Sequence, residues 1–217
     1  MLLSMDAFGL RPRLKAMADR LAEAGYTVLV PTLFYRHGRA PVVELPEFID
    51  PAARPEILRS VLPMMRALTS ERAMRDAGAC LRAPAECPAV ADGPVALTGY
   101  CMGARLALLT AGTYPDRVAA AGFHGGRLAT DAPDSPHLVA GNVTAELYVG
   151  HADQDPSLPV ERIERLEDAL TEAGVRHRRE VYPAAGHGFT EADHLASHPE
   201  ADERRGAALL DLLERTF

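Results

Sequence analysis

The sequence predicts an α/β protein with a mostly parallel sheet covered by helices on both faces. Short apolar runs alternate along the chain with longer stretches in which apolar residues recur every three or four positions. The first pattern is typical of buried parallel strands and the second of amphipathic helices. The chain has 217 residues, of which 47% are hydrophobic and 24% charged, and shows no internal repeat. We therefore expect a single domain over residues 1–217.

The strands are predicted from short runs of β-forming or small apolar residues bounded by glycine or proline. They cover residues 2–5, 26–31, 95–99, 118–126, 145–150 and 177–183. The run at 26–31, which ends in Pro31, is expected to be a buried strand. Residues 32–53 carry proline and glycine at short intervals and predict a long loop.

The helices are predicted from apolar residues at helical spacing. In the first, Leu14, Met17 and Leu21 share one face, and Gly25 ends the helix. The second runs from Pro55 to about residue 81, with an interruption allowed at Pro63. Further helices are expected at 104–111, 159–173 and 199–214, bounded by Gly112, Pro159, Gly174 and Pro199.

The charge balance argues against two classes of partner. Lys and Arg number 23 against 30 Asp and Glu, a net charge of −7. A nucleic-acid surface needs clustered basic residues, and an anionic membrane surface would repel this chain. No apolar run approaches the roughly 20 residues of a membrane span, and the first residues lack the basic region of a signal peptide. The sequence predicts a cytoplasmic protein.

The cysteines do not indicate a disulfide framework or a zinc site. There are three, Cys80, Cys87 and Cys101, with no CxxC pair. Acidic residues and histidines at 151–155 and 191–198 have spacings that a metal can use. The first group has another role, given below, and the second fits a polar helix face. No metal is expected.

The stretch ALTGYCMGARLALL, residues 96–109, places Cys101 at a sharp strand-to-helix turn. A nucleophile flanked by Gly99 and Gly103 is the pattern of the nucleophile elbow. The glycines remove Cβ atoms that would collide where helix and strand fold back on each other. The following helix points its N-terminus at the thiol and favours a thiolate. The alternative is a buried cysteine in a glycine-rich turn.

Residues further along the chain match a catalytic triad. In proteins with a nucleophile elbow the triad follows the order nucleophile, acid, histidine, with each member after a strand. Asp153 and Asp155 follow the strand at 145–150, and His187 follows the strand at 177–183 within a Gly-His-Gly loop. Either aspartate fits the position of the acid.

The chain resembles the dienelactone hydrolase family. The resemblance is carried by MDAFGLRP, VPTLFYR, GYCMGARLAL, FHGG, QDPSLP and YPAAGHGF, between residues 5 and 189. The cysteine at the elbow is its most specific part. The family implies an α/β-hydrolase fold and a Cys-His-Asp triad that cleaves lactones or esters of small carboxylate-bearing compounds without a cofactor.

The resemblance assigns roles to particular residues. It implies that Cys101 is the nucleophile and His187 the base. It favours Asp155 as the acid, because the family has proline four residues after it, here Pro159, and leaves Asp153 as the alternate. It places the oxyanion hole at the backbone amides of Ala7 and Met102.

The sequence also departs from the family pattern. Asp6 stands where the best-known members carry a glutamate that interacts with the thiol. Glu191 stands where they carry an arginine for the substrate carboxylate, so we expect weak activity on dienelactone. Four residues are candidates for the pocket by position, with a solvated loop as the alternative for each: Tyr35, Arg36, His124 and Arg127.

These observations favour a hydrolase that cleaves a small ester or lactone through a thioester intermediate, as a monomer or weak homodimer. A second hypothesis is a thioesterase or other acyl hydrolase with the same triad. A third is a non-catalytic ligand-binding or redox-sensing protein that uses Cys101. The sequence does not identify the physiological substrate.

The beginning of the family pattern is missing from this chain. The fold usually has two strands ahead of the one at 2–5, so we expect about six strands rather than eight. Residues 26–31 should then lie at an edge of the sheet, with Val28 and Val30 uncovered. We favour a start at an internal methionine over pairing of this edge in a dimer.

Overall fold

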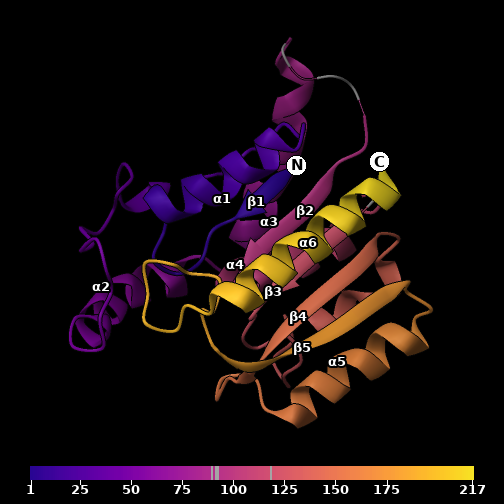
Figure 1. Ribbon diagram of the computed structural model, residues 1–217. Coiled ribbons are helices and arrows are strands. Elements are labelled where there is room, and N and C mark those ends of the chain that lie inside the picture. Colours follow the sequence, from indigo (N-terminus) through magenta and orange to yellow (C-terminus); the bar gives the residue numbers. More distant parts are fainter. Residues whose placement is uncertain (89, 91–92, 118) are drawn as a thin grey trace.

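A computed structural model describes residues 1–88, 90, 93–117 and 119–217 (Figure 1). At its centre is a sheet of five parallel strands in the order β1-β2-β3-β4-β5. The strands are β1 (Leu2–Ser4), β2 (Ala96–Tyr100), β3 (Ala119–Phe123), β4 (Glu146–Gln154) and β5 (His177–Gly186). The predicted parallel α/β architecture is confirmed. Residue 118 of the expected strand 118–126 lies outside the described residues.

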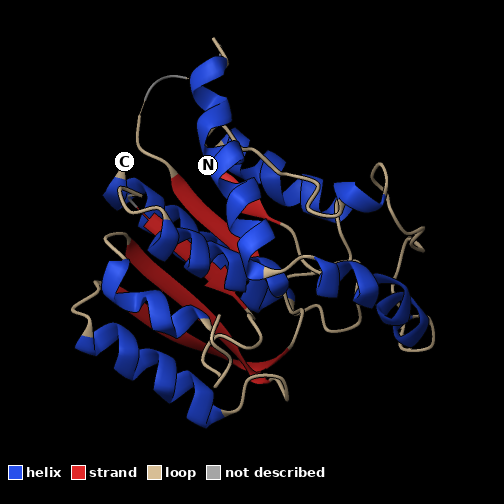
Figure 2. Cartoon of the chain, turned by 180° about the vertical axis from the view of Figure 1, so that it is seen from behind, coloured by secondary structure: helices blue, strands red, loops and turns tan. Residues whose placement is uncertain are grey.

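Helices cover both faces of the sheet, as expected. They are α1 (Pro12–Glu23), α2 (Arg54–Ala67), α3 (Ser70–Arg82), α4 (Met102–Thr113), α5 (Val160–Glu172) and α6 (Pro199–Thr216), with short 3₁₀ turns at Tyr35–His37, Ala83–Glu86 and Pro136–Asn142. Figure 1 shows α6 across the front of the sheet, and Figure 2 gives the view from behind. Among the described residues, no helix combines the length and apolar character needed to cross a membrane.

The strands are apolar on both sides because side chains alternate between two cores. Leu3 belongs to the core that includes residues of α1 and α6, whereas its neighbour Leu2 belongs to the core that includes residues of α3, α4 and α5. The same alternation separates Tyr148 from Leu147 on β4. A sheet buried on both faces therefore requires the near-continuous apolar runs that mark its strands in the sequence.

The segment 26–31 is not a buried strand. It lies outside β1, as expected for the edge, but joins it through a single bridge between Leu29 and Leu2. Its apolar side chains are half-buried, and Val28 and Val30 pack against the core on the α1 side rather than standing uncovered. Pro31 cannot donate a ladder hydrogen bond, which limits further pairing. The sheet consequently has five strands and this bridge, not six strands.

The helical stretch after the long loop breaks at a different place than expected. Pro63 lies within α2, and the chain leaves the helix at Leu68. Thr69 then caps α3 by accepting a hydrogen bond from the amide of Arg72 at 3.3 Å. A side-chain cap of this kind satisfies one of the free amides at the start of a new helix.

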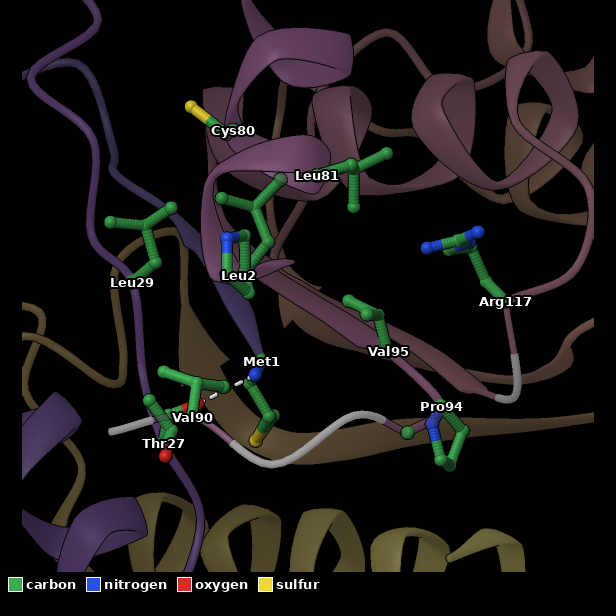
Figure 3. Close-up of a pocket in the computed structure, with 12 residues that line it drawn as sticks. Met1, Leu2, Thr27, Leu29, Cys80, Leu81, Val90, Pro94, Val95 and Arg117 are labelled. Atoms are coloured by element: carbon green, nitrogen blue, oxygen red, sulfur yellow. Dashed lines mark hydrogen bonds between the residues drawn. The ribbon is translucent and has the colours of Figure 1, made fainter. Parts of the chain in front are cut away.

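A cavity of about 230 Å³ lies at the end of the sheet where β1 and β2 begin (Figure 3). Leu2, Leu29, Leu81 and Val95 contribute apolar walls. None of the site residues expected from the sequence lines this cavity. The predicted chemistry therefore belongs to the opposite end, where the strands finish.

Helix α4 packs on β1 and β2 at a distance that only glycine permits. A Cβ atom on Gly99 would lie 2.1 Å from the carbonyl oxygen of Gly103. A Cβ atom on Gly103 would lie 2.1 Å from the carbonyl oxygen of Ser4. Both obstacles are backbone atoms, which cannot rotate away, so any side chain here forces α4 off the sheet.

We expect Gly103→Ala to lower the free energy of unfolding by about 2–3 kcal/mol, because the backbone must shift to admit the methyl group. Urea unfolding measures this change. Gly141→Ala is the matched control, since no atom lies within 4 Å of the added Cβ. Equal stabilities of the two variants would contradict the packing argument.

Candidate active site

Strand pairing brings an aspartate and a histidine together at the carboxyl edge of the sheet. Gln154 at the end of β4 pairs with Gly186 at the end of β5. The next residues along the two strands are Asp155 and His187. Because the strands are parallel, both side chains leave the sheet at the same edge.

Cys101 leaves the same edge from β2 in a strained conformation. Its φ is 52° and its ψ is −113°, a region that residues with a side chain rarely adopt. The amide of Cys101 donates to the carbonyl of Phe123 at 3.0 Å, and α4 begins at the next residue, Met102. The predicted strand-turn-helix context of the elbow is present.

The three side chains form one hydrogen-bonded chain. His187 Nε2 lies 3.1 Å from Cys101 Sγ, and His187 Nδ1 lies 2.7 Å from Asp155 Oδ2. The other carboxylate oxygen of Asp155 accepts from the amide and the hydroxyl of Ser157, at 2.8 and 2.6 Å. Ser157 thus fixes the carboxylate in the orientation that reaches the imidazole.

The structure brings Asp155 to His187, not Asp153. The carboxylate of Asp153 is exposed and accepts from the amide of Ala184 at 2.9 Å. Ala184 has a positive φ of 58°, and the pairing of β4 with β5 shifts register between Ala152 and Gln154. Asp153 therefore stabilises an irregularity in the sheet.

Electrostatics favour charge separation along this chain of groups. Burial disfavours a charged His187, but the neighbouring Cys101 and Asp155 outweigh it and raise the pKa of His187 to about 10. Burial also opposes the charge on Asp155, yet the hydrogen bond from His187 keeps the pKa of Asp155 below its usual value. The buried carboxylate of Asp155 therefore favours an imidazolium at His187.

A small pocket of about 20 Å³ opens beside Cys101. It is lined by Ala7, one of the two residues expected to supply oxyanion-hole amides. Among the described residues, neither the amide of Ala7 nor that of Met102 donates a hydrogen bond. Both donors are thus available to a substrate oxygen.

Arg11 unites three carboxylates beneath this pocket. Its guanidinium lies 2.8 Å from Asp6, 2.5 Å from Glu191 and 2.6 Å from Asp193. The side chains of Arg11, Asp6 and Glu191 are each less than 5% exposed. Burial and the nearby Asp6 raise the pKa of Glu191, against the effect of Arg11. Asp6 accepts from Arg11 and the amide of Phe8, and not from the Cys101 thiol.

His124, a pocket candidate from the sequence, packs against His187. Its ring centroid lies 5.3 Å from that of His187, in an edge-on arrangement. It is fully buried, and burial and the nearby His187 hold the pKa of His124 well below its usual value. Its Nε2 lies 2.8 Å from the Thr190 hydroxyl. A neutral ring here avoids repelling an imidazolium.

Three of the other sequence candidates lie elsewhere. Tyr35 and Arg36 both bond Asp76 on α3, and Arg127 is exposed at a positive φ of 57°. None of them lines the small pocket or the cleft beside it. For Tyr35 and Arg36, Asp76 provides a carboxylate partner that position in the sequence does not reveal.

Two arginines at the site were not expected from the sequence. Arg11 follows the turn after Asp6, and an arginine lost at position 191 was a signal for a compensating one nearby. Arg54, at the start of α2, borders both the small pocket and the cleft, and its buried Nε has no partner in the described part of the chain. No sequence pattern singled out Arg54.

The parallel sheet, the strained turn at Cys101 and the order Cys, Asp, His define the α/β-hydrolase class. Comparison with known proteins narrows this class. Residues 1–217 match the dienelactone hydrolase family, and the chain belongs to it. It is an enzyme of the dienelactone hydrolase type.

Individual relatives agree with this assignment. Carboxymethylenebutenolidase from Rhodococcus opacus is 28% identical over 213 residues, which are 97% of this chain and 76% of that protein. A dienelactone hydrolase-like promiscuous phosphotriesterase from metagenomic libraries superposes with a TM-score of 0.76 at 28% identity, over 100% of this chain and 85% of that one. A crystal structure from Klebsiella pneumoniae shares the fold, with a TM-score of 0.84 at 21% identity over 98% and 85% of the two chains.

We expect Arg11→Met to lower the free energy of unfolding by about 3–5 kcal/mol, because it leaves buried carboxylates without their cation. Arg36→Met is the matched control, since it breaks an exposed two-bond contact with Asp76 and should change stability little. Chemical denaturation of both variants measures these changes. Similar decreases in the free energy of unfolding would show that the buried cluster contributes no more than the exposed contact.

The pairing of Asp155 with His187 should make stability depend on pH. The lowered pKa of Asp155 stabilises the fold above pH ~4 and the benefit is lost as the pH falls through the folded value. The raised pKa of His187 stabilises fully below pH ~6.5 and the benefit is lost as the pH rises through about 10. The stability difference between the natural chain and Asp155→Asn should peak between these limits. A difference that does not vary with pH would refute this.

Proposed function

We propose that the protein hydrolyses a small ester or lactone with Cys101 as nucleophile, His187 as base and Asp155 as the orienting acid. The observation that carries the proposal is the unbroken hydrogen-bonded chain from Cys101 Sγ through both nitrogens of His187 to Asp155. Nucleophile and base lie within the distance that proton transfer requires.

The first half of the reaction forms a thioester. The Cys101 proton passes to His187 Nε2, and the thiolate attacks the carbonyl carbon. The carbonyl oxygen becomes an oxyanion between the amides of Ala7 and Met102, each donor being typically worth ~3 kcal/mol of barrier. The intermediate collapses as the carbon–oxygen bond of the ester breaks, and His187 gives its proton to the leaving oxygen.

The second half releases the acid. His187 Nε2 accepts a proton from water, and the resulting hydroxide attacks the thioester carbonyl. The same two amides stabilise the second oxyanion, and the carbon–sulfur bond breaks. The departing thiolate is restored beside the imidazolium. Asp155 holds Nδ1–H in both halves, so that Nε2 always faces Cys101.

The substrate class follows from the family and from the charges at the pocket. Relatives named carboxymethylenebutenolidase favour a lactone or ester, and the resemblance implies one that carries a carboxylate. Glu191 is tied to Arg11, which also pairs with Asp6 and Asp193, and weak activity on dienelactone stays a prediction. Arg54 brings a guanidinium to the border of the pocket.

A thioesterase would use the same residues, because only the leaving atom differs. Turnover of matched oxygen esters and thioesters separates the two activities. Membership in a hydrolase family favours either enzyme over the ligand-binding or redox-sensing protein considered from the sequence.

We expect Cys101→Ala to abolish turnover of p-nitrophenyl acetate, and iodoacetamide to do the same to the natural chain. Asp155→Asn should lower kcat by roughly 10²–10⁴-fold, because the imidazolium loses its partner. Asp153→Asn is the control and should remain within a few-fold of the natural chain, since its carboxylate bonds Ala184. A larger loss for Asp153→Asn than for Asp155→Asn would overturn the assignment.

A further inference from the structure

Two unequal spaces meet at His187. The small pocket beside Cys101 has a volume of about 20 Å³. An open cleft of about 740 Å³ lies next to it. Arg54, His187 and His194 border both spaces, so the two adjoin at these side chains. A substrate with its carbonyl at Cys101 therefore extends into one cramped and one roomy space.

The reaction geometry assigns one part of the ester to each space. His187 must protonate the leaving oxygen, so the leaving group lies on the side of the imidazole. The cleft is in contact with this imidazole, because His187 lines it. Ala7, with its oxyanion amide, lines only the small pocket. The acyl group is left with the small pocket.

The small pocket limits the acyl group to a few atoms. A water molecule occupies about 10–15 Å³ of such space, so 20 Å³ admits little more than one water-sized group. Its walls do not yield easily. Glu191 is held by Arg11, and His124 is fully buried against His187.

The cleft instead suits an extended apolar group. Its walls come from the segment entering α2, the turn after β4 and the loop before α6, and include Ile49, Pro51, Pro55, Leu58 and Leu195. Leu195 is 63% exposed, and contact of this apolar side chain with water is unfavourable in free energy. The amide of Ile49 donates to the carbonyl of Asp193 at 2.8 Å and ties two of the walls together.

We propose that the enzyme takes esters with a short acyl group and a long apolar leaving group, which lies in the cleft. The proposal rests on the hydrolase function proposed above. It adds which side of the ester is short and which is long. Burial of each additional methylene of the alcohol strengthens binding, whereas each methylene added to the acyl group meets fixed walls.

Hexyl acetate and ethyl hexanoate test this directly. They are isomers with the same atoms, and they differ only in which side of the ester carries the long chain. We expect kcat/KM for hexyl acetate to exceed that for ethyl hexanoate at least tenfold, after correction for their base-catalysed rates in solution. Competition of each isomer with p-nitrophenyl acetate gives a second measure. Equal values, or a preference for ethyl hexanoate, would overturn the proposal.

Leu195→Asp tests the cleft itself. It should reduce the preference for hexyl acetate at least fivefold, because a carboxylate disfavours the alkyl chain. Leu138→Asp, at a leucine 58% exposed that lines neither space, should leave the preference unchanged. If p-nitrophenyl acetate turnover depends on Cys101 while the isomers are equal, only this proposal fails. If no ester turnover depends on Cys101, the proposed function fails and this one with it.

Discussion

The close approach of α4 to β1 and β2 is the constraint from which the site follows. Because Gly103 touches the backbone of Ser4, the chain must reverse within a single residue after β2. That residue is Cys101, and its positive φ projects the thiol above the sheet edge. The reversal also starts α4 at Met102, so the partial positive charge of the helix N-terminus lies next to Cys101. One steric contact thus sets the positions of both Cys101 and the start of α4.

The register of β4 and β5 positions His187, as the close packing of α4 positions Cys101. His187 and Asp155 meet because the ends of β4 and β5 are paired. The irregularity held by Asp153 comes just before that pair, so the last pairing follows a shifted register. Two neighbouring aspartates consequently have different tasks, one in the sheet and one at the imidazole.

Features that depend on local backbone could be predicted from the sequence. The elbow needs two glycines around Cys101, and the order of strands and loops locates His187. Features that depend on distant partners could not. Arg11 meets Glu191 across 180 positions of the chain, and Arg36 is held by Asp76 across 40. The segment 26–31 has strand-like residues, yet the number of its partners depends on its neighbours in the sheet, not on its own composition.

The Arg11 contacts join residues far apart in the sequence, and this affects how the protein folds during synthesis. A ribosome delivers β1 and Arg11 first, the thiol later, and His187 and Glu191 near the end. Contacts between such distant segments form slowly, because the loop between them must close. The growing polypeptide therefore carries Cys101 with neither its base nor the completed charge cluster. The hydrogen-bonded chain from Cys101 to Asp155 is complete only once β5 has joined the sheet.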